Sequence, residues 1–206
     1  DNSIYTIQSI SKKYVTILND DMLSSLIDKM SVVEVVSFDL ETTEIDPMKA
    51  EIVGISFSFS KNEAYYIPIQ FPEVIEGYNL SLDYVLSRLR VIFESKKIAF
   101  VGQNIKYDCI ILRQLGITVK NIYFDTMIAA HLVNPIRNVY NINELSLDYL
   151  GYQKISIESL IGHKSSQIKM FEVPLERIKD YACEDADITF QLYEVLKTNL
   201  EQKSLI

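Results

Sequence analysis

The stretch VVEVVSFDLET, residues 32–42, decides the fold class. β-Branched and aromatic residues dominate this run, which predicts a central β-strand. Asp39 and Glu41 are two residues apart near its end, so their side chains point to the same face of the strand. Two unpaired carboxylates in such a place would cost several kcal/mol unless a cation compensates them. The alternative is that they mark the frayed, solvated end of the strand.

The segments around this strand predict a mixed α/β sheet. Further strands are expected at residues 14–18, 51–60, 63–69, 97–102 and 122–125. Helices are expected at residues 20–30, 81–94, 105–115, 126–133, 143–150, 156–162 and 174–202. Asn19 or Asp20 is available as the N-cap of the first helix, and Pro174 suits the first turn of the last. We therefore expect a mixed β-sheet flanked by α-helices, in a single domain spanning residues 1–206.

Composition limits the classes of function. A chain of 206 residues with 48% hydrophobic residues can bury a real core, which excludes intrinsic disorder. Its apolar runs are too short to span a bilayer, so no membrane association is expected. Two cysteines and two histidines exclude a disulfide framework and argue against a zinc site. The net charge of -8 argues against gripping long duplex DNA, but not against holding a few nucleotides at a cationic metal centre.

A second acidic site lies in GQNIKYDCIIL, residues 102–112. On a helix beginning near Ile105, Asp108 falls on the apolar stripe, while Asn104 lies one turn earlier and could cap the helix. Because this stripe should face the core, a carboxylate on it favours a functional role. The alternative is a partly exposed Asp108 that the helix dipole stabilises in the first turn.

A third acidic site lies in IKDYACEDADITFQLYEVL, residues 178–196. Asp185 interrupts the apolar stripe of this helix, and Tyr181 lies one turn earlier on the same side. Glu184 and Asp187 project elsewhere, so we expect them to be solvated. The stripe therefore favours Asp185 over Asp187 as the functional acid.

Together these sites place four carboxylates on inward faces of one strand and two helices. A cluster of oxygen ligands without His or Cys suits hard cations such as Mg²⁺ or Mn²⁺. Paired hard cations held by carboxylates hydrolyse phosphodiesters. The chain has neither a glycine-rich phosphate loop nor a credible Ser-His-Asp arrangement, so an NTPase and a serine hydrolase are both disfavoured.

Three motifs in order resemble the Asp-Glu-Asp-Asp exonuclease superfamily, in the branch whose third motif is Tyr-x-x-x-Asp. They are FDLETTEID (residues 38–46), VGQNIKYD (residues 101–108) and YACEDADITFQL (residues 181–192), and FDTMIAAHLVN (residues 124–134) resembles the strand and helix between the last two. The chain is most similar to the proofreading domain of bacterial-type DNA polymerase I, in family A. The resemblance covers nearly the whole chain and implies a ribonuclease H-like fold.

The resemblance also implies roles for particular residues. Asp39, Glu41 and Asp185 would hold one metal ion, and Asp39 would bridge to a second that Asp108 supports. Tyr181 and Glu41 would orient the attacking water. The substrate-binding positions near the terminal nucleotide would be Thr42, Ile45, Gln103, Asn104 and Tyr107, with Ile45 as a wedge between the last two bases.

Two departures from the family pattern affect positions expected to bind single-stranded DNA. Ile157 stands where the family often has an aromatic residue that stacks on a base. Arg137 lies upstream of the position of an Arg-His pair.

The activity implied is two-metal-ion 3′→5′ hydrolysis at single-stranded DNA 3′ ends. The enzyme would be a monomer that proofreads for a polymerase domain in the same parent chain, from which residues 1–206 would be an excised part. The compartment would be the nucleoid-associated cytoplasm in a bacterium, or a DNA-containing organelle.

Two alternatives stay open. One is a ribonuclease D-like RNA 3′ exonuclease. The first motif argues against it, because the motif continues E-T-T rather than E with a bulky aromatic residue. The other is a non-catalytic module of a polymerase, which should have lost an acid.

Overall fold

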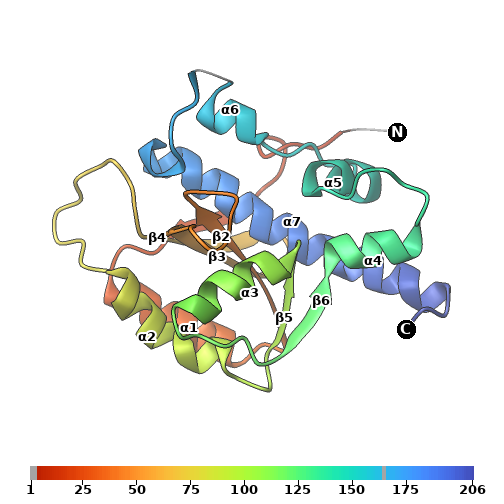
Figure 1. Cartoon of the computed structure of the whole chain (residues 1–206), viewed down its shortest axis with the longest axis horizontal. Helices are drawn as coiled ribbons and strands as arrows, with labels where there is room; N and C mark the ends of the chain where they lie inside the picture. Colours follow the sequence, from red (N-terminus) through yellow and green to blue (C-terminus); the bar gives the residue numbers. More distant parts are fainter. Residues whose placement is uncertain (1–3, 164–165) are drawn as a thin grey trace.

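The computed structural model describes residues 4–163 and 166–206, and a mixed sheet forms its centre (Figure 1). The six strands are β1 (Lys13–Thr16), β2 (Val35–Thr42), β3 (Ile52–Ser60), β4 (Glu63–Pro68), β5 (Ala99–Gly102) and β6 (Ile122–Asp125). Their order across the sheet is β1-β4-β3-β2-β5-β6. β3 is antiparallel to β2 and β4, whereas the pairs β1–β4, β2–β5 and β5–β6 are parallel. The predicted mixed sheet is confirmed.

The helices begin and end close to the predicted positions. They are α1 (Asp20–Ser31), α2 (Leu82–Phe93), α3 (Ile105–Gln114), α4 (Thr126–Val133), α5 (Ile142–Leu150), α6 (Ile157–Ile161) and α7 (Leu175–Gln202), with a 3-10 turn η2 (Met170–Glu172) before α7. Asn19, rather than Asp20, caps α1, because its side-chain oxygen accepts a hydrogen bond from the Met22 N–H at 3.0 Å. Pro174 is the N-cap of α7, so the helix begins one residue later than predicted.

Helices cover the two faces of the sheet unequally (Figure 1). α1, α2 and α3 pack on one face and enclose the larger apolar core, with Phe38, Phe57, Phe93 and Phe100 in mutual contact. α7 crosses the other face, and α4, α5 and α6 pack around it. α7 therefore lies between the sheet and the outer helices.

Alternation along β2 assigns its residues to these two layers. Val36, Phe38 and Leu40 are buried in the core beneath α1–α3. Ser37 faces α7, where its hydroxyl donates to the Ala186 carbonyl at 2.6 Å. Since residues two apart share a face, Asp39 and Glu41 also point toward α7.

A glycine allows the tight packing beside Glu41. Gly54 on β3 pairs with Glu41, and a Cβ at Gly54 would lie 2.2 Å from the hydroxyl oxygen of Tyr66. The ring of Tyr66 therefore fills the space of the missing side chain, and any larger residue at position 54 would displace it.

Candidate active site

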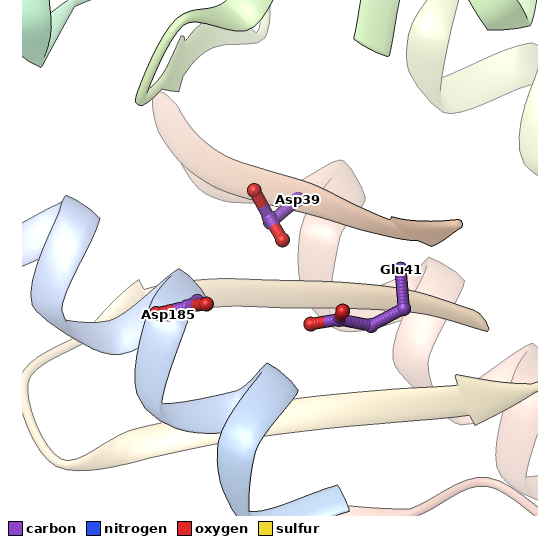
Figure 2. Close-up of side chains that lie close together, drawn as sticks. All are labelled: Asp39, Glu41 and Asp185. Atoms are coloured by element: carbon purple, nitrogen blue, oxygen red, sulfur yellow. The ribbon is translucent and has the colours of Figure 1, made fainter. Parts of the chain in front are cut away.

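The strand β2 and the helix α7 bring three carboxylates together. One oxygen atom each from Asp39, Glu41 and Asp185 lies within 4.8 Å of the others. Figure 2 shows Asp39 and Glu41 projecting from the strand and Asp185 from the helix that faces it. Asp185 is far from Asp39 and Glu41 in sequence, so their meeting depends on α7 crossing β2 one layer above the sheet.

Crowding and burial make it costly to ionise these acids. Burial, followed by the charge of Asp185, raises the pKa of Asp39 to about 8, although the ammonium of Lys154 opposes the shift. Burial and the charges of Asp39 and Asp185 raise the pKa of Glu41 well above its usual value. The Oε1 atom of Glu41 is buried without a hydrogen-bond partner. The ammonium of Lys154 therefore compensates the negative charge of this cluster only in part, and at least one of its oxygens has no partner.

Asp108 is buried beside this cluster but outside the group of three. Its Oδ1 accepts a hydrogen bond at 3.3 Å from the backbone N–H of Leu40, the residue between Asp39 and Glu41. Burial, and then the charge of Asp39, raise the pKa of Asp108 well above its usual value. The structure thus places Asp108, on α3, against the backbone of β2 between Asp39 and Glu41.

Tyr181 lies one turn before Asp185 on α7 and is mostly buried. Burial, followed by the charges of Asp185 and Glu41, raises its pKa far above the ordinary value. The hydroxyl of Tyr181 therefore keeps its proton at any physiological pH and can act as a hydrogen-bond donor at the cluster.

A groove of about 860 Å³ opens over Glu41 and Tyr181. Four of the five residues predicted near the terminal nucleotide line it, namely Thr42, Ile45, Asn104 and Tyr107. The fifth, Gln103, does not: its side-chain amide donates to the Tyr140 carbonyl at 2.8 Å and accepts from the Thr126 hydroxyl.

The walls of the groove include residues that the sequence did not single out. Ile161 of α6 and Met170 of η2 form an apolar wall of the groove. Ile157, which stands where the family often has an aromatic residue, also lines this wall. Ile45 itself is 94% exposed. On the near side, the hydroxyls of Thr42 and Tyr107 are hydrogen-bonded at 2.8 Å.

The alternative role of Asn104, as a side-chain cap of α3, is wrong. Asn104 adopts a left-handed backbone conformation (φ 56°) and its side chain forms no capping hydrogen bond. Instead the carboxylate of Asp125 accepts from the backbone N–H groups of Asn104 at 3.1 Å and Ile105 at 3.0 Å. The amide of Asn104 is therefore left to face the groove.

The expected solvation of Glu184 and Asp187 is also wrong, because both side chains are fully buried. The Asp187 carboxylate accepts hydrogen bonds from the Tyr14 hydroxyl at 2.8 Å, the Asn62 N–H at 2.9 Å and the Gln191 amide at 2.8 Å. Burial raises the pKa of Asp187 and of Glu184. Asp187 thus joins α7 to the far edge of the sheet, whereas Asp185 faces Asp39.

One charged residue of the site was not predicted from the sequence. The ammonium of Lys154, from the segment between α5 and α6, forms ion pairs with Asp185 and with Glu184. A signal was present in the alternation of residues 152–155, in which Tyr152 and Lys154 point inward and Gln153 outward. A lysine at an inward position of such a segment indicates a buried acidic partner.

Within the described ranges, none of the helices has the length and apolarity needed to cross a membrane.

Comparison with known proteins agrees with this geometry. A family model described as 3′-5′ exonuclease matches residues 14–201. DNA polymerase I of Borreliella burgdorferi is 33% identical over 204 residues, which is 99% of this chain and 22% of that protein. The chain spans about a fifth of the length of the curated relatives it matches.

Solved structures show the same fold. The catalytic core of RRP6 from Trypanosoma brucei superimposes with a TM-score of 0.71 at 14% identity, covering 98% of this chain and 51% of that one. Brucella melitensis NrnC with bound Mg²⁺ has a TM-score of 0.66 at 18% identity, covering 95% of this chain and 84% of that one. The match over most of its length to both the family model and the polymerase shows that this chain belongs to the 3′-5′ exonuclease family and is homologous to the exonuclease domains of DNA polymerase I.

Proposed function

We propose that the chain is a divalent-metal-dependent 3′-5′ exonuclease that removes nucleotides from the 3′ end of single-stranded DNA, as the proofreading part of a longer DNA polymerase. The observation that carries the proposal is the carboxylate cluster of Asp39, Glu41 and Asp185, with oxygen atoms within 4.8 Å of one another, beside a groove that Glu41 lines. In a family of exonucleases, such a cluster is the natural place for the reaction.

The residues present fit a pair of hard cations. Asp39, Glu41 and Asp185 would hold one, and Asp108 together with Asp39 would hold the other. The unpartnered Oε1 of Glu41 and the raised pKa values of the buried acids indicate a site whose negative charge Lys154 compensates only in part. Divalent cations bound by carboxylates supply the Lewis acidity that activates water and stabilises the leaving oxygen of a phosphodiester.

The protein's own side chains would orient the reacting groups. Tyr181, whose hydroxyl keeps its proton, would donate a hydrogen bond to the attacking water, and Glu41 would accept one from it. Both line the groove, so a phosphodiester bound there would lie between them. Their task is positioning, which lowers the entropic part of the barrier.

The groove suits the last nucleotides of a single strand rather than a duplex. Ile45, exposed on one side, and Ile157 and Met170 on the other offer apolar surface to bases, and Lys169 offers a cation to the backbone. With a net charge of -8, the chain has little to attract a long polyanion, so binding would depend on these contacts and on the metal site.

The attached polymerase is proposed on the homology to DNA polymerase I, whose chains are about five times as long as the matched region. NrnC, a protein of the same fold, was solved with bound Mg²⁺, which supports Mg²⁺ as the metal here.

The test uses 5′-labelled single-stranded DNA and RNA of the same sequence, each with Mg²⁺ and with EDTA. We expect a ladder of products that shortens from the 3′ end, release of nucleoside 5′-monophosphates, a preference for DNA, and no activity in EDTA. Internal cleavage or equal activity in EDTA would refute the proposal. RNA degraded faster than DNA would favour the ribonuclease D-like alternative, and no activity on either substrate the non-catalytic one.

A further inference from the structure

Lys154 is a buried cation at the edge of the carboxylate cluster. It lies between α5 and α6, and its side chain has no exposed surface. Lysine is almost never fully buried unless it is paired, because the loss of hydration must be offset by a partner. The partners of Lys154 therefore explain why it is there.

Two adjacent acids of α7 hold this ammonium. Lys154 Nζ lies 3.3 Å from Glu184 Oε2 and forms a second ion pair with Asp185 Oδ1. It also lies 4.7 Å from the centre of the Tyr181 ring, within the range of a cation–π contact. Burial opposes the charged form of Lys154, but the charges of Asp185 and Glu184 outweigh it, so the pKa of Lys154 is raised.

Glu184 is itself held by hydrogen bonds from the segment that carries Lys154. Its Oε1 accepts a hydrogen bond from the Tyr152 hydroxyl at 2.6 Å, and its Oε2 accepts one from the Ile155 N–H at 2.8 Å. Both donors flank Lys154 in sequence, so the segment and the acid fix each other. Glu184 is thus satisfied by several donors, whereas the Lys154 ammonium is the one cation that pairs with Asp185 in the part of the chain that the structure describes.

Asp185 is therefore shared between the lysine and the cluster. Its carboxylate meets Lys154 on one side and contributes an oxygen to the group with Asp39 and Glu41 on the other. The positive charge of Lys154 also offsets the repulsion that raises the pKa of Asp39 and of Glu41. A divalent cation bound to Asp185 would be repelled by the fixed positive charge of Lys154.

We propose that Lys154 is a resident counter-cation of the site, a positioning residue that balances Asp185 when no metal is bound and competes with the divalent metal for that carboxylate. The inference rests on the proposed metal-binding role of the cluster. Lys154 keeps the crowded acids compatible with the folded chain, and it weakens the affinity for metal. The metal site is consequently stable when empty and reversibly filled.

The test compares the parent with Lys154→Met, which keeps a similar apolar chain without the charge, and Lys154→Arg, which keeps the charge. Lys97→Met is the matched control, because it removes a lysine that is exposed before β5. The dissociation constant for Mn²⁺ is measured by electron paramagnetic resonance of free Mn²⁺, and thermal melts are recorded in EDTA and in Mn²⁺.

We expect Lys154→Met to bind Mn²⁺ at least about fivefold more tightly than the parent, the lower end of common coupling between two sites. It should melt below the parent in EDTA, and Mn²⁺ should reduce this difference, because the metal supplies the missing charge. Lys154→Arg and Lys97→Met should bind Mn²⁺ within about twofold of the parent, as expected where no coupling is changed.

Should Lys154→Met fail to fold, the double variant Lys154→Met/Glu184→Gln removes both charges of the buried Lys154–Glu184 pair, so that Asp185 alone loses its counter-charge. It should show the same tightening. Unchanged or weaker Mn²⁺ binding in the variant that folds would overturn the inference while leaving the proposed function intact. A parent that binds no Mn²⁺ would overturn both.

Discussion

The raised pKa of Asp39 makes the stability of the metal-free protein depend on pH. The pKa rises from 3.8 in a free side chain to about 8 in the folded chain. Between these values the folded state holds a proton that the unfolded state has lost, so stability falls as pH rises. We predict that in EDTA the melting temperature decreases from pH 5.5 to pH 7.5.

The size of the effect follows from the number of protons. One proton bound only in the folded state changes the free energy of unfolding by about 1.4 kcal/mol per pH unit, or at most about 2.7 kcal/mol over two units. Because Asp39 is only half-buried, we expect Asp39 to contribute about 1–2 kcal/mol. For a domain of 206 residues this corresponds to a decrease of about 2–8 °C.

Thermal melts by circular dichroism at several pH values in EDTA measure this slope for the parent and for Asp39→Asn. The variant has an amide that cannot titrate, so its melting temperature should depend less on pH and exceed that of the parent at pH 7.5. Asp83→Asn, which changes an exposed acid of α2, is the matched control and should keep the parental slope. Subtracting the slope of Asp39→Asn from the slope of the parent cancels the contributions of groups that titrate in all three proteins. A parental melting temperature that is flat or rises over this range would refute the assignment of the buried proton to Asp39.

Asp39→Ala and Asp185→Ala should each lower exonuclease activity by several orders of magnitude in a single-turnover assay with Mg²⁺, because each removes a proposed metal ligand. Tyr181→Phe should retain measurable turnover, since one lost hydrogen bond to the attacking water costs about 10²–10³-fold at most by analogy with single oxyanion donors. Asp187→Ala should leave turnover by the folded fraction unchanged but lower stability in urea by about 1–3 kcal/mol, because it strands buried donors such as the Tyr14 hydroxyl. Ile45→Ala should leave the melting temperature unchanged, as this side chain is 94% exposed, and should raise KM for single-stranded DNA.

The position of the cluster on β2 could be predicted because a strand has only two faces. Because residues two apart on a strand share a face, Asp39 and Glu41 were expected on one face, and the structure shows them there, with Phe38 and Leu40 in the core on the other face. The partner helix could be identified by an acid on an apolar stripe, and Asp185 indeed faces Asp39. Local periodicity was sufficient for each element separately.

The same periodicity failed where an element is covered on more than one side. A helical stripe predicts what is buried on a helix with one covered face, but α7 lies between the sheet and the outer helices α4–α6. Glu184 and Asp187, which lie off the stripe, therefore point into protein rather than solvent. Their burial depends on segments around residues 14, 62 and 152–155, which no local pattern in α7 reveals.

The net charge of the site depends on Lys154 as well as on its acidic residues. Glu184 and Asp185 are neighbours on α7 that face different surroundings, and Lys154 contacts both. Glu184 fixes the lysine to the segment that follows α5, while Asp185 presents it to the cluster on β2. A buried acid that does not line the groove thereby helps to hold the positive charge beside the cluster. On the proposed competition, the affinity for metal would depend on the connection between α5 and α6 as well as on the carboxylates themselves, since that connection supplies the lysine.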